Sequence, residues 1–64
     1  MRCKYVGNRV FKLENGNEII FVKWVNSVKG NQYFVAKDNN DKESVYYIVR
    51  KNEKDQITEI EKVR

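Results

Sequence analysis

The sequence predicts an all-β protein, a small antiparallel meander of five or six strands that is curled or barrel-like. Segments rich in valine, isoleucine, tyrosine and phenylalanine alternate with short turn signals, which is the pattern of consecutive strands. The 64 residues contain no proline, so every segment keeps its backbone donors for strand pairing. Residues 19–26 are apolar at both odd and even positions, so both faces of this strand need cover.

The turn signals divide the chain into six candidate strands. Asn15-Gly16 is the strongest signal, because a two-residue hairpin turn needs positive φ at both positions and this dipeptide tolerates it. The predicted strands are residues 1–6, 9–13, 19–26, 31–37, 44–51 and 56–63. The predicted turns are Gly7-Asn8, Asn15-Gly16 and residues 27–30, 38–43 and 52–55.

The last segment is open to two interpretations. Ile57, Ile60 and Val63 recur at a helical spacing, and Asn52 could cap a short C-terminal helix. The β-branched residues of the segment favour a strand, which is the prediction we adopt, with the short helix as the alternative.

Hairpin geometry assigns the side chains to two faces. Two-residue loops pair Phe11 with Ile20, and a four-residue loop at residues 27–30 sets Trp24 opposite Tyr33. The face expected to form the core carries Cys3, Tyr5, Val10, Ile19, Phe21, Val25, Phe34 and Ala36, joined by Val45, Tyr47 and Val49. The second face carries Lys4, Val6, Arg9, Phe11, Ile20, Val22, Trp24, Tyr33, Val35 and Lys37, with Tyr46 and Arg50 as further surface contacts. One β-bulge would exchange the faces beyond it.

Chain length limits how two apolar faces can be covered. We expect residues 1–64 to form a single domain whose core only marginally offsets the chain entropy. A sheet that curls onto itself is the commonest way to hide two apolar faces in so few residues, which indicates a small barrel of SH3-like or OB-like character. A homodimer would also cover the second face, so a homo-oligomer is expected.

Positive charge is concentrated in the first half of the chain. The net charge is +4, and residues 1–37 hold seven basic side chains against Glu14 and Glu18. This asymmetry predicts a basic face that could meet phosphate or an acidic partner. A solvated surface rich in lysine explains the same asymmetry equally well.

The side chains offer little for catalysis. There is no histidine to act as a base near neutral pH, and Cys3, the single cysteine, has no imidazole to activate it. Asp38, Asp41 and Glu43 lack the glycine and the terminal glutamate of a calcium-binding loop, so we expect a solvated polar loop there. The prediction is a protein that is not an enzyme and holds neither a metal nor a cofactor.

The sequence shows no signal for a membrane or for export. No apolar run is long enough to cross a bilayer, and residues 1–7 lack the apolar region of a signal peptide. Cys3 alone cannot form an intramolecular disulfide. A cytoplasmic location is therefore expected.

Two classes of function fit these features. The first is a binding module for nucleic acid or a nucleotide, in which aromatic side chains stack on bases and basic side chains neighbour phosphates. Its candidate ligand-binding residues are Lys4, Arg9, Phe11, Trp24, Tyr33 and Lys37. Trp24 and Tyr33 could equally be a cross-strand packing pair that serves the fold alone.

The second class is a protein-binding or self-associating module that buries the second face against a copy of itself or a target protein. The composition, rich in asparagine and lysine, resembles that of short proteins of AT-rich bacteria and their phages, including small inhibitors of host systems. Lys4-Tyr5-Val6-Gly7, followed by Trp24 on a later basic strand, resembles the small archaeal chromatin proteins with an SH3-like fold that bind the DNA minor groove. The resemblance covers these positions only, and we transfer no DNA-binding role from it.

Overall fold

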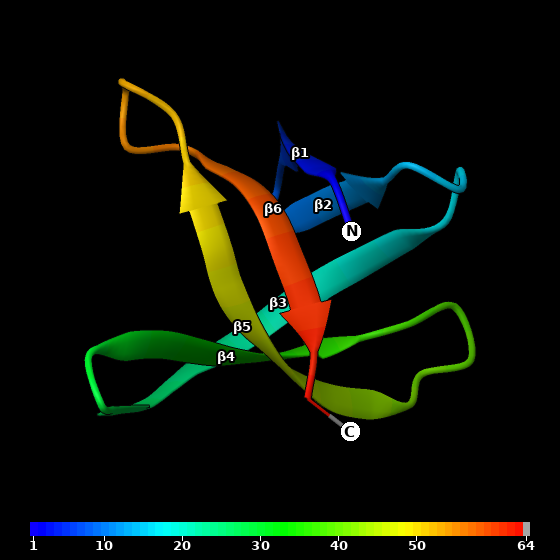
Figure 1. Ribbon diagram of the computed structural model, residues 1–64. Coiled ribbons are helices and arrows are strands. Elements are labelled where there is room, and N and C mark those ends of the chain that lie inside the picture. Colours follow the sequence, from blue (N-terminus) through cyan, green and yellow to red (C-terminus); the bar gives the residue numbers. More distant parts are fainter. Residues whose placement is uncertain (64) are drawn as a thin grey trace.

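The chain forms one antiparallel sheet of six strands in the computed structural model, which describes residues 1–63 apart from the side chains of residues 26–28. The strands are β1 (Cys3–Gly7), β2 (Val10–Leu13), β3 (Glu18–Val28), β4 (Asn31–Lys37), β5 (Glu43–Lys51) and β6 (Ile57–Lys62). Each strand pairs with its neighbours in sequence, so the sheet is a meander (Figure 1). The predicted all-β meander is confirmed, and its last segment is a strand.

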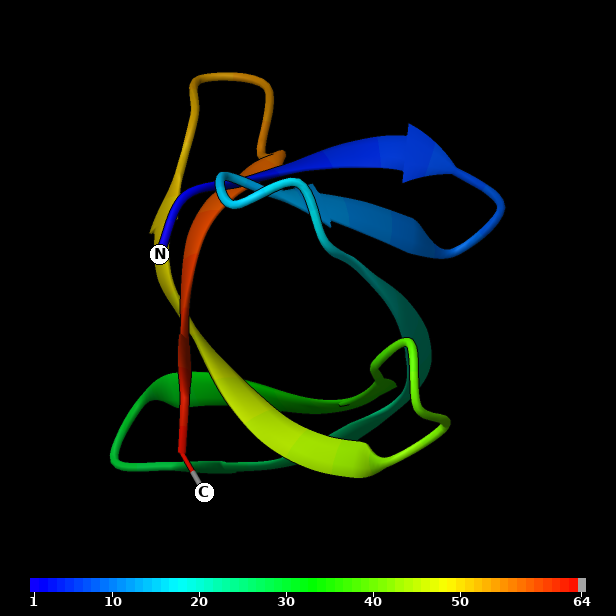
Figure 2. The same ribbon diagram turned by 90° about the vertical axis from the view of Figure 1, so that its right-hand side faces the viewer.

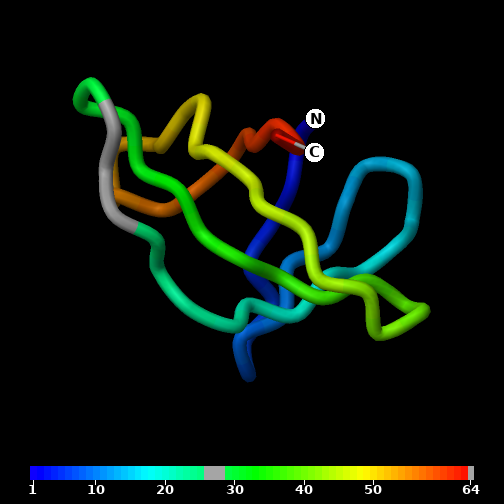
Figure 3. Tube along the Cα trace, turned by 90° about the horizontal axis from the view of Figure 1, so that it is seen from below, coloured from blue at the N-terminus to red at the C-terminus, as the bar shows by residue number. Residues whose placement is uncertain are grey.

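The sheet curls until its first and last strands meet (Figures 2 and 3). An isolated antiparallel bridge joins Arg2 to Glu59. The Met1 amino group donates to the Ile60 carbonyl oxygen at 2.6 Å, and the Ile60 N–H donates to the Met1 carbonyl oxygen at 2.9 Å. Within residues 1–63 no ladder continues this contact along β1, so the sheet is curled but not closed.

Three of the five hairpins use the same kind of three-residue loop. In each loop a backbone hydrogen bond from residue i+3 to residue i closes a turn, and the last loop residue has positive φ. These left-handed residues are Gly16 (90°), Asp41 (61°) and Asp55 (64°). A three-residue loop with a left-handed third position is a standard hairpin connection, and Gly16 meets its requirement without strain.

The acidic loop between β4 and β5 is organised by Asp38. Its Oδ1 accepts the N–H groups of Asn40 at 2.8 Å and Lys42 at 3.0 Å. These bonds, the one from Lys42 first, lower the pKa of the Asp38 carboxyl, because they stabilise its charged form. The carboxylate therefore serves the turn, as the Asn52 side chain does in the loop between β5 and β6.

The other two hairpins have two-residue turns with positive φ at both positions. They are Asn8-Arg9, at 52° and 65°, and Lys29-Gly30, at 54° and 82°. The predicted turn at Gly7-Asn8 is therefore displaced by one residue. The predicted four-residue loop at residues 27–30 is wrong, because β3 continues to Val28 and pairs it with Asn31.

The loop after β2 shifts the register of β2 and β3 by one residue from the prediction. Phe11 pairs with Ile19 and Val10 with Ile20, whereas a two-residue loop would pair Phe11 with Ile20. A shift of one residue moves every side chain of a strand to the opposite face. The prediction that Phe11 lies on the second face is wrong, since Phe11 is 5% exposed in the core.

β3 also contains a β-bulge, which changes the faces again. Val22 and Lys23 of β3 together oppose the single residue Val35 of β4. Three positions separate Phe21 from Trp24, so a regular strand would place them on opposite faces. The extra residue puts both on the same face.

The concave face of the curled sheet holds an aromatic core centred on Phe34, which is fully buried. The ring of Phe34 lies 5.6–6.1 Å from the rings of Phe11, Phe21, Trp24 and Tyr46. Aromatic pairs attract one another at centroid distances of roughly 4.5–7 Å. The buried cluster is completed by Leu13, Ile19, Ala36 and Ile60.

The convex face is less well covered, although it is partly apolar. Ile20 is 49% exposed and Val25 is 38% exposed. The predicted core residues that lie outside the buried cluster are Tyr5, Val10, Val25, Val45, Tyr47 and Val49. Tyr46, predicted at the surface, is buried instead, because the register turns β5 to place Tyr46 opposite Phe34.

Burial of Tyr46 predicts a loss of stability at alkaline pH. Desolvation raises the pKa of Tyr46 above its ordinary value, and the Asp38 carboxylate adds to the rise. The folded state holds this proton more tightly than the unfolded state, so the stabilisation is complete below about pH 10 and is lost as the pH rises through the folded-state pKa. We expect the wild-type protein to lose unfolding free energy relative to Tyr46→Phe as the pH rises above about 10, measured by urea titration. A difference that stays constant with pH would contradict this.

Candidate functional site

A pocket of about 180 Å³ opens at one end of the concave face. Its lining, which we call the aromatic pocket, consists of Tyr5, Arg9, Phe11, Phe21, Trp24 and Ile57. Tyr5 is 50% exposed and Trp24 is 55% exposed, whereas Phe11 is buried. The lining is aromatic or apolar except for Arg9, which suits a planar ring that carries a negative group beside it.

Each exposed ring of the pocket rests on a ring of the core. Trp24 meets Phe21 edge to face with centroids 5.2 Å apart, and Tyr5 meets Phe11 in the same way at 5.2 Å. The first pair exists because the bulge places Phe21 and Trp24 on one face. Packing on Phe21 and Phe11 therefore holds the two exposed rings in position.

The turn between β1 and β2 ties Arg9 to the pocket. The Arg9 N–H donates to the Tyr5 hydroxyl at 3.0 Å, and the Arg9 carbonyl oxygen accepts the Phe21 N–H at 2.7 Å. Tyr5 and Phe21 both line the pocket. The main chain of Arg9 is therefore hydrogen-bonded to two residues of the pocket lining, which fixes the position from which its side chain extends.

The hairpin of β1 and β2 carries basic side chains that form no ion pair with carboxylates of the described residues. They are Arg2, Lys4, Arg9 and Lys12. Lys4 and Lys12 pair directly across the ladder, where like charges repel. On its other side Lys12 pairs with Glu18 of β3, whose opposite charge offsets part of that repulsion.

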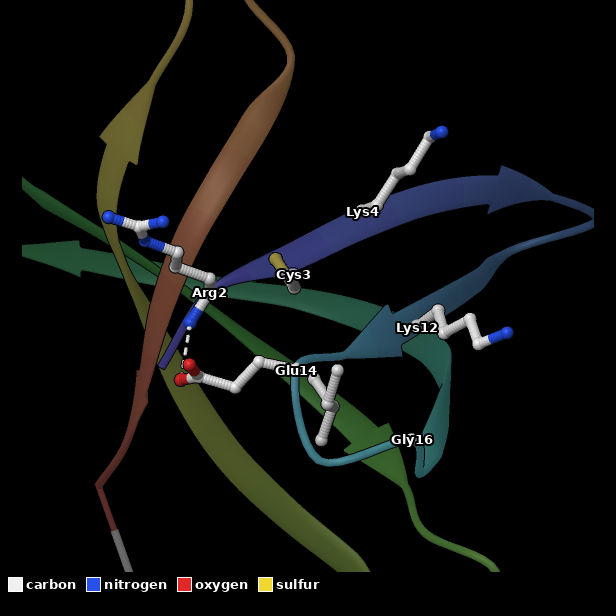
Figure 4. A pocket seen from close by; sticks show the side chains of 7 residues that line it. Arg2, Cys3, Lys4, Lys12, Glu14 and Gly16 are labelled. Atoms are coloured by element: carbon white, nitrogen blue, oxygen red, sulfur yellow. Dashed lines mark hydrogen bonds between the residues drawn. The ribbon is translucent and has the colours of Figure 1, made fainter.

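A shallow hollow of about 360 Å³ lies on this hairpin (Figure 4). Its lining, which we call the basic hollow, consists of Arg2, Cys3, Lys4, Lys12, Leu13, Glu14 and Gly16. Glu14 directs its carboxylate at the backbone N–H of Arg2, which donates to Oε1 at 3.0 Å. The side chains of Lys4 and Lys12 extend away from their strands (Figure 4). The single carboxylate of the hollow is thus engaged with the main chain.

The structure brings three of the six predicted site residues together. Arg9, Phe11 and Trp24 line the aromatic pocket. Phe11 is buried, so it supports Tyr5 and offers little surface to a ligand. Lys4 lies on the same hairpin as Arg9 and lines the basic hollow.

The other two predicted site residues lie on the convex face. Tyr33 pairs with Val25 and Tyr47, and its ring centroid is 6.0 Å from that of Tyr47, so the predicted pairing of Trp24 with Tyr33 is wrong. Lys37 pairs with Ile20 on this face, and its Nζ lies 3.4 Å from a carboxylate oxygen of Asp41. Neither residue lines the aromatic pocket.

The prediction from sequence omits three residues of the pocket. Tyr5 and Phe21 are assigned to the core by simple alternation, although the pocket is the place where that core reaches the surface. Ile57 comes from β6, more than thirty residues away from the other pocket residues in sequence. Only the curl of the sheet shows that Ile57 belongs to the site.

Cys3, a free cysteine on β1, is partly buried, and its Sγ lies 3.9 Å from the carbonyl oxygen of Ile57. Burial raises the pKa of the Cys3 thiol, the N-terminal ammonium group lowers it in part, and Glu59 raises it further. A raised pKa leaves little of the reactive thiolate at neutral pH. No group of three or more potential metal-ligating side chains occurs in the part of the chain that the structure describes.

Comparison with protein-family models, with curated proteins and with solved structures finds no match to this chain. Residues 1–63 contain no helix of the length and apolar character needed to cross a bilayer. The interpretation of the site therefore rests on its own geometry.

Replacing Arg9 by glycine is expected to stabilise the fold. Glycine relieves left-handed strain of about 1–2 kcal/mol and adds roughly 0.5–1 kcal/mol of chain entropy to the unfolded state, so the unfolding free energy should rise by about 0.5–1 kcal/mol. The bonds to Tyr5 and Phe21 use main-chain atoms of residue 9 and remain available.

Urea titration of Arg9→Gly and of a second variant, Lys29→Gly, measures this change in unfolding free energy. Lys29→Gly is the matched control, because Lys29 has φ of 54° in the other two-residue turn and should respond in the same direction. A loss of stability in Arg9→Gly alone would show that the arginine side chain itself supports the fold.

Proposed function

We propose that this protein is a non-enzymatic binding protein that uses the aromatic pocket and the basic hairpin to bind a phosphate-bearing ligand, either nucleic acid or a nucleotide. The observation that carries the proposal is that Trp24 is half-exposed in a pocket that Tyr5 also lines. Among the described residues, Arg9 is the one charged side chain of this lining. For the architecture we propose a small barrel of SH3-like or OB-like character. The curl of the sheet and the contact of β1 with β6 support it.

Stacking on the exposed rings supplies the first part of the affinity. A base on an aromatic side chain gains about 1–3 kcal/mol. Trp24 and Tyr5 are already held by Phe21 and Phe11, so a ligand would lose little free energy to the ordering of these side chains.

Charge determines the kind of ligand that suits the pocket. Among the described residues no carboxylate lines the aromatic pocket, so a cationic ligand would be repelled by Arg9 with no acid to offset that repulsion. A neutral ring with an adjacent anionic group satisfies both the aromatic walls and the guanidinium. Nucleotides and nucleic acids combine these two groups.

Ligand binding is expected to quench the fluorescence of Trp24, the only tryptophan in the chain. Trp24→Ala should weaken binding by about 1–3 kcal/mol, because it removes one stacking surface. The measurement is a titration at low salt with panels of DNA, RNA and nucleotides, followed by anisotropy of a labelled ligand for the variant. Unchanged Trp24 emission across all three panels would exclude the proposal.

Two matched controls locate the binding site. Tyr33→Ala removes an aromatic side chain from the convex face and should leave the affinity unchanged. Arg9→Gly should weaken binding although it stabilises the fold, whereas Lys29→Gly removes the same charge away from the pocket. Equal effects of the two glycine variants would show that only net charge matters.

Self-association or binding of a target protein is a second candidate function, favoured by the convex face. Ile20 and Val25 of β3 are partly exposed there. Next to them, Tyr33 of β4 and Tyr47 of β5 form an aromatic pair. Apolar patches rimmed by charge often mark protein interfaces. A small inhibitor of a host protein, encoded by a phage or a mobile element, would use such a face in the same way.

Self-association predicts a solution mass that rises with concentration toward that of a dimer. Ile20→Asp should return the protein to a monomer, because it buries a charge in the interface. Asn40→Asp is the control, since it adds the same charge in the exposed loop between β4 and β5. Sedimentation analysis that finds a monomer at every concentration would exclude a homodimer.

A further inference from the structure

Resting on the proposed function, we propose that the ligand is a single strand of nucleic acid. One base enters the aromatic pocket, and the sugar-phosphate backbone follows β1 to the basic hollow. Three features of the structure support this: the small volume of the pocket, the lining residues that the hollows along β1 share, and the cations that line them.

The pocket is too small to enclose a whole nucleotide and its neighbours. Its volume is about 180 Å³, whereas pockets that enclose drug-sized ligands measure roughly 300–1,000 Å³. One ring system can enter, and the rest of the ligand must lie on the surface outside. The ligand therefore needs further contacts beyond the pocket to gain affinity.

Three hollows share lining residues along β1, and we call this series of hollows the track. The aromatic pocket shares Tyr5 and Ile57 with a hollow of about 200 Å³ between β1 and β6, which we call the interstrand hollow. The interstrand hollow shares Cys3 and Lys4 with the basic hollow. The track exists because the bridge between β1 and β6 does not continue along β1.

The track presents cations and neutral polar groups to a ligand. Arg9 stands at the aromatic pocket, Lys4 at the interstrand hollow, and Arg2 and Lys12 at the basic hollow. Among the lining residues the single acid is Glu14, whose carboxylate binds the main chain. The interstrand hollow is also lined by the uncharged polar side chains Asn52, Gln56 and Thr58.

A duplex does not match this arrangement. Its bases are stacked and paired, so a base could reach Trp24 only if it were first flipped out of the helix. In a single strand the bases are free to enter the pocket one at a time, and the phosphates remain on the surface beside Lys4 and Lys12. The geometry points to a strand of about four nucleotides, the lower end of the range for small β-barrel sites.

The experiment compares thymidine monophosphate with oligothymidylates of about two, four and eight nucleotides and with a duplex of the longest length. Affinity, read from Trp24 quenching, should rise at least about tenfold from the mononucleotide to the strand of four nucleotides and then level off. The duplex should bind more weakly than the single strand of equal length. Titrations at several salt concentrations give the number of phosphate contacts.

Substitutions along the track test its path. Lys4→Ala and Lys12→Ala should each lower the slope of log affinity against log salt by about 0.7, the value for one phosphate of a single strand. Lys29→Ala is the matched control outside the track and should leave the slope unchanged. Both lysines of the track are exposed, so the fold should survive, and far-UV circular dichroism would verify it.

The outcomes separate this inference from the function on which it rests. A mononucleotide that binds as tightly as the longer strands would overturn the single strand and leave the proposed function standing. Equal binding of the duplex and the single strand would also overturn the single strand as the ligand. Equal salt slopes for all three lysine variants would overturn the path along β1. Absence of binding to every oligonucleotide and nucleotide would overturn both proposals.

Discussion

The packing of four aromatic rings around Phe34 is the interaction on which the rest of this structure depends. Phe34 lies on β4, and its partners come from β2, β3 and β5. The rings can surround one side chain only if the sheet curls, because a flat sheet would hold β2 and β5 on either side of β4 at fixed spacings. The curl then brings β1 to β6, where the Arg2–Glu59 bridge forms. Core packing thus determines the shape of the sheet.

The candidate site is the exposed edge of this same core. Trp24 touches Phe34 at a centroid distance of 6.1 Å and yet is half-exposed, and Tyr5 reaches the core through Phe11. A binding surface made in this way needs no separate loop, which matters in a chain of 64 residues. The same aromatic contacts therefore stabilise the fold and keep the pocket rigid. The exposed members, Trp24 and Arg9, are the positions where binding can be altered with least effect on the core.

The two surfaces of the sheet differ in character. The concave side ends in an aromatic pocket next to a hairpin with basic side chains that are free of ion pairs within residues 1–63. The convex side is apolar and tyrosine-rich, and its lysine at position 37 is paired with Asp41. We propose a phosphate-bearing ligand for the first surface and, as the second candidate function, a protein partner for the second. Lys4 and Lys12 alternate with Cys3, Phe11 and Leu13 of the core, so they project from the outer side of the hairpin of β1 and β2.

Local patterns in the sequence account for the positions of the strands. The segment 31–37 coincides with β4, the predicted strand 44–51 begins one residue after β5 does, and the predicted strand 56–63 extends one residue beyond β6 at each end. Turn signals and runs of β-branched residues act within a few residues, so they can be read without the fold. The basic first half was likewise accessible from composition. Arg9, Phe11 and Trp24, three of the six predicted site residues, do line one pocket, although the predicted register that grouped them was wrong.

The assignment of faces depended on the tertiary structure. Asn15-Gly16 fits a two-residue loop and also a three-residue loop with Gly16 last, and the second is adopted because it turns Phe11 and Ile19 together into the core. The bulge at Val22 and Lys23 has no local signal, since it is stabilised by the packing of Trp24 on Phe34 across two strands. Sequence alternation therefore established that the third strand has two apolar faces. Long-range packing selected which face is buried, because the free energy that separates the registers comes from contacts between residues far apart in the chain.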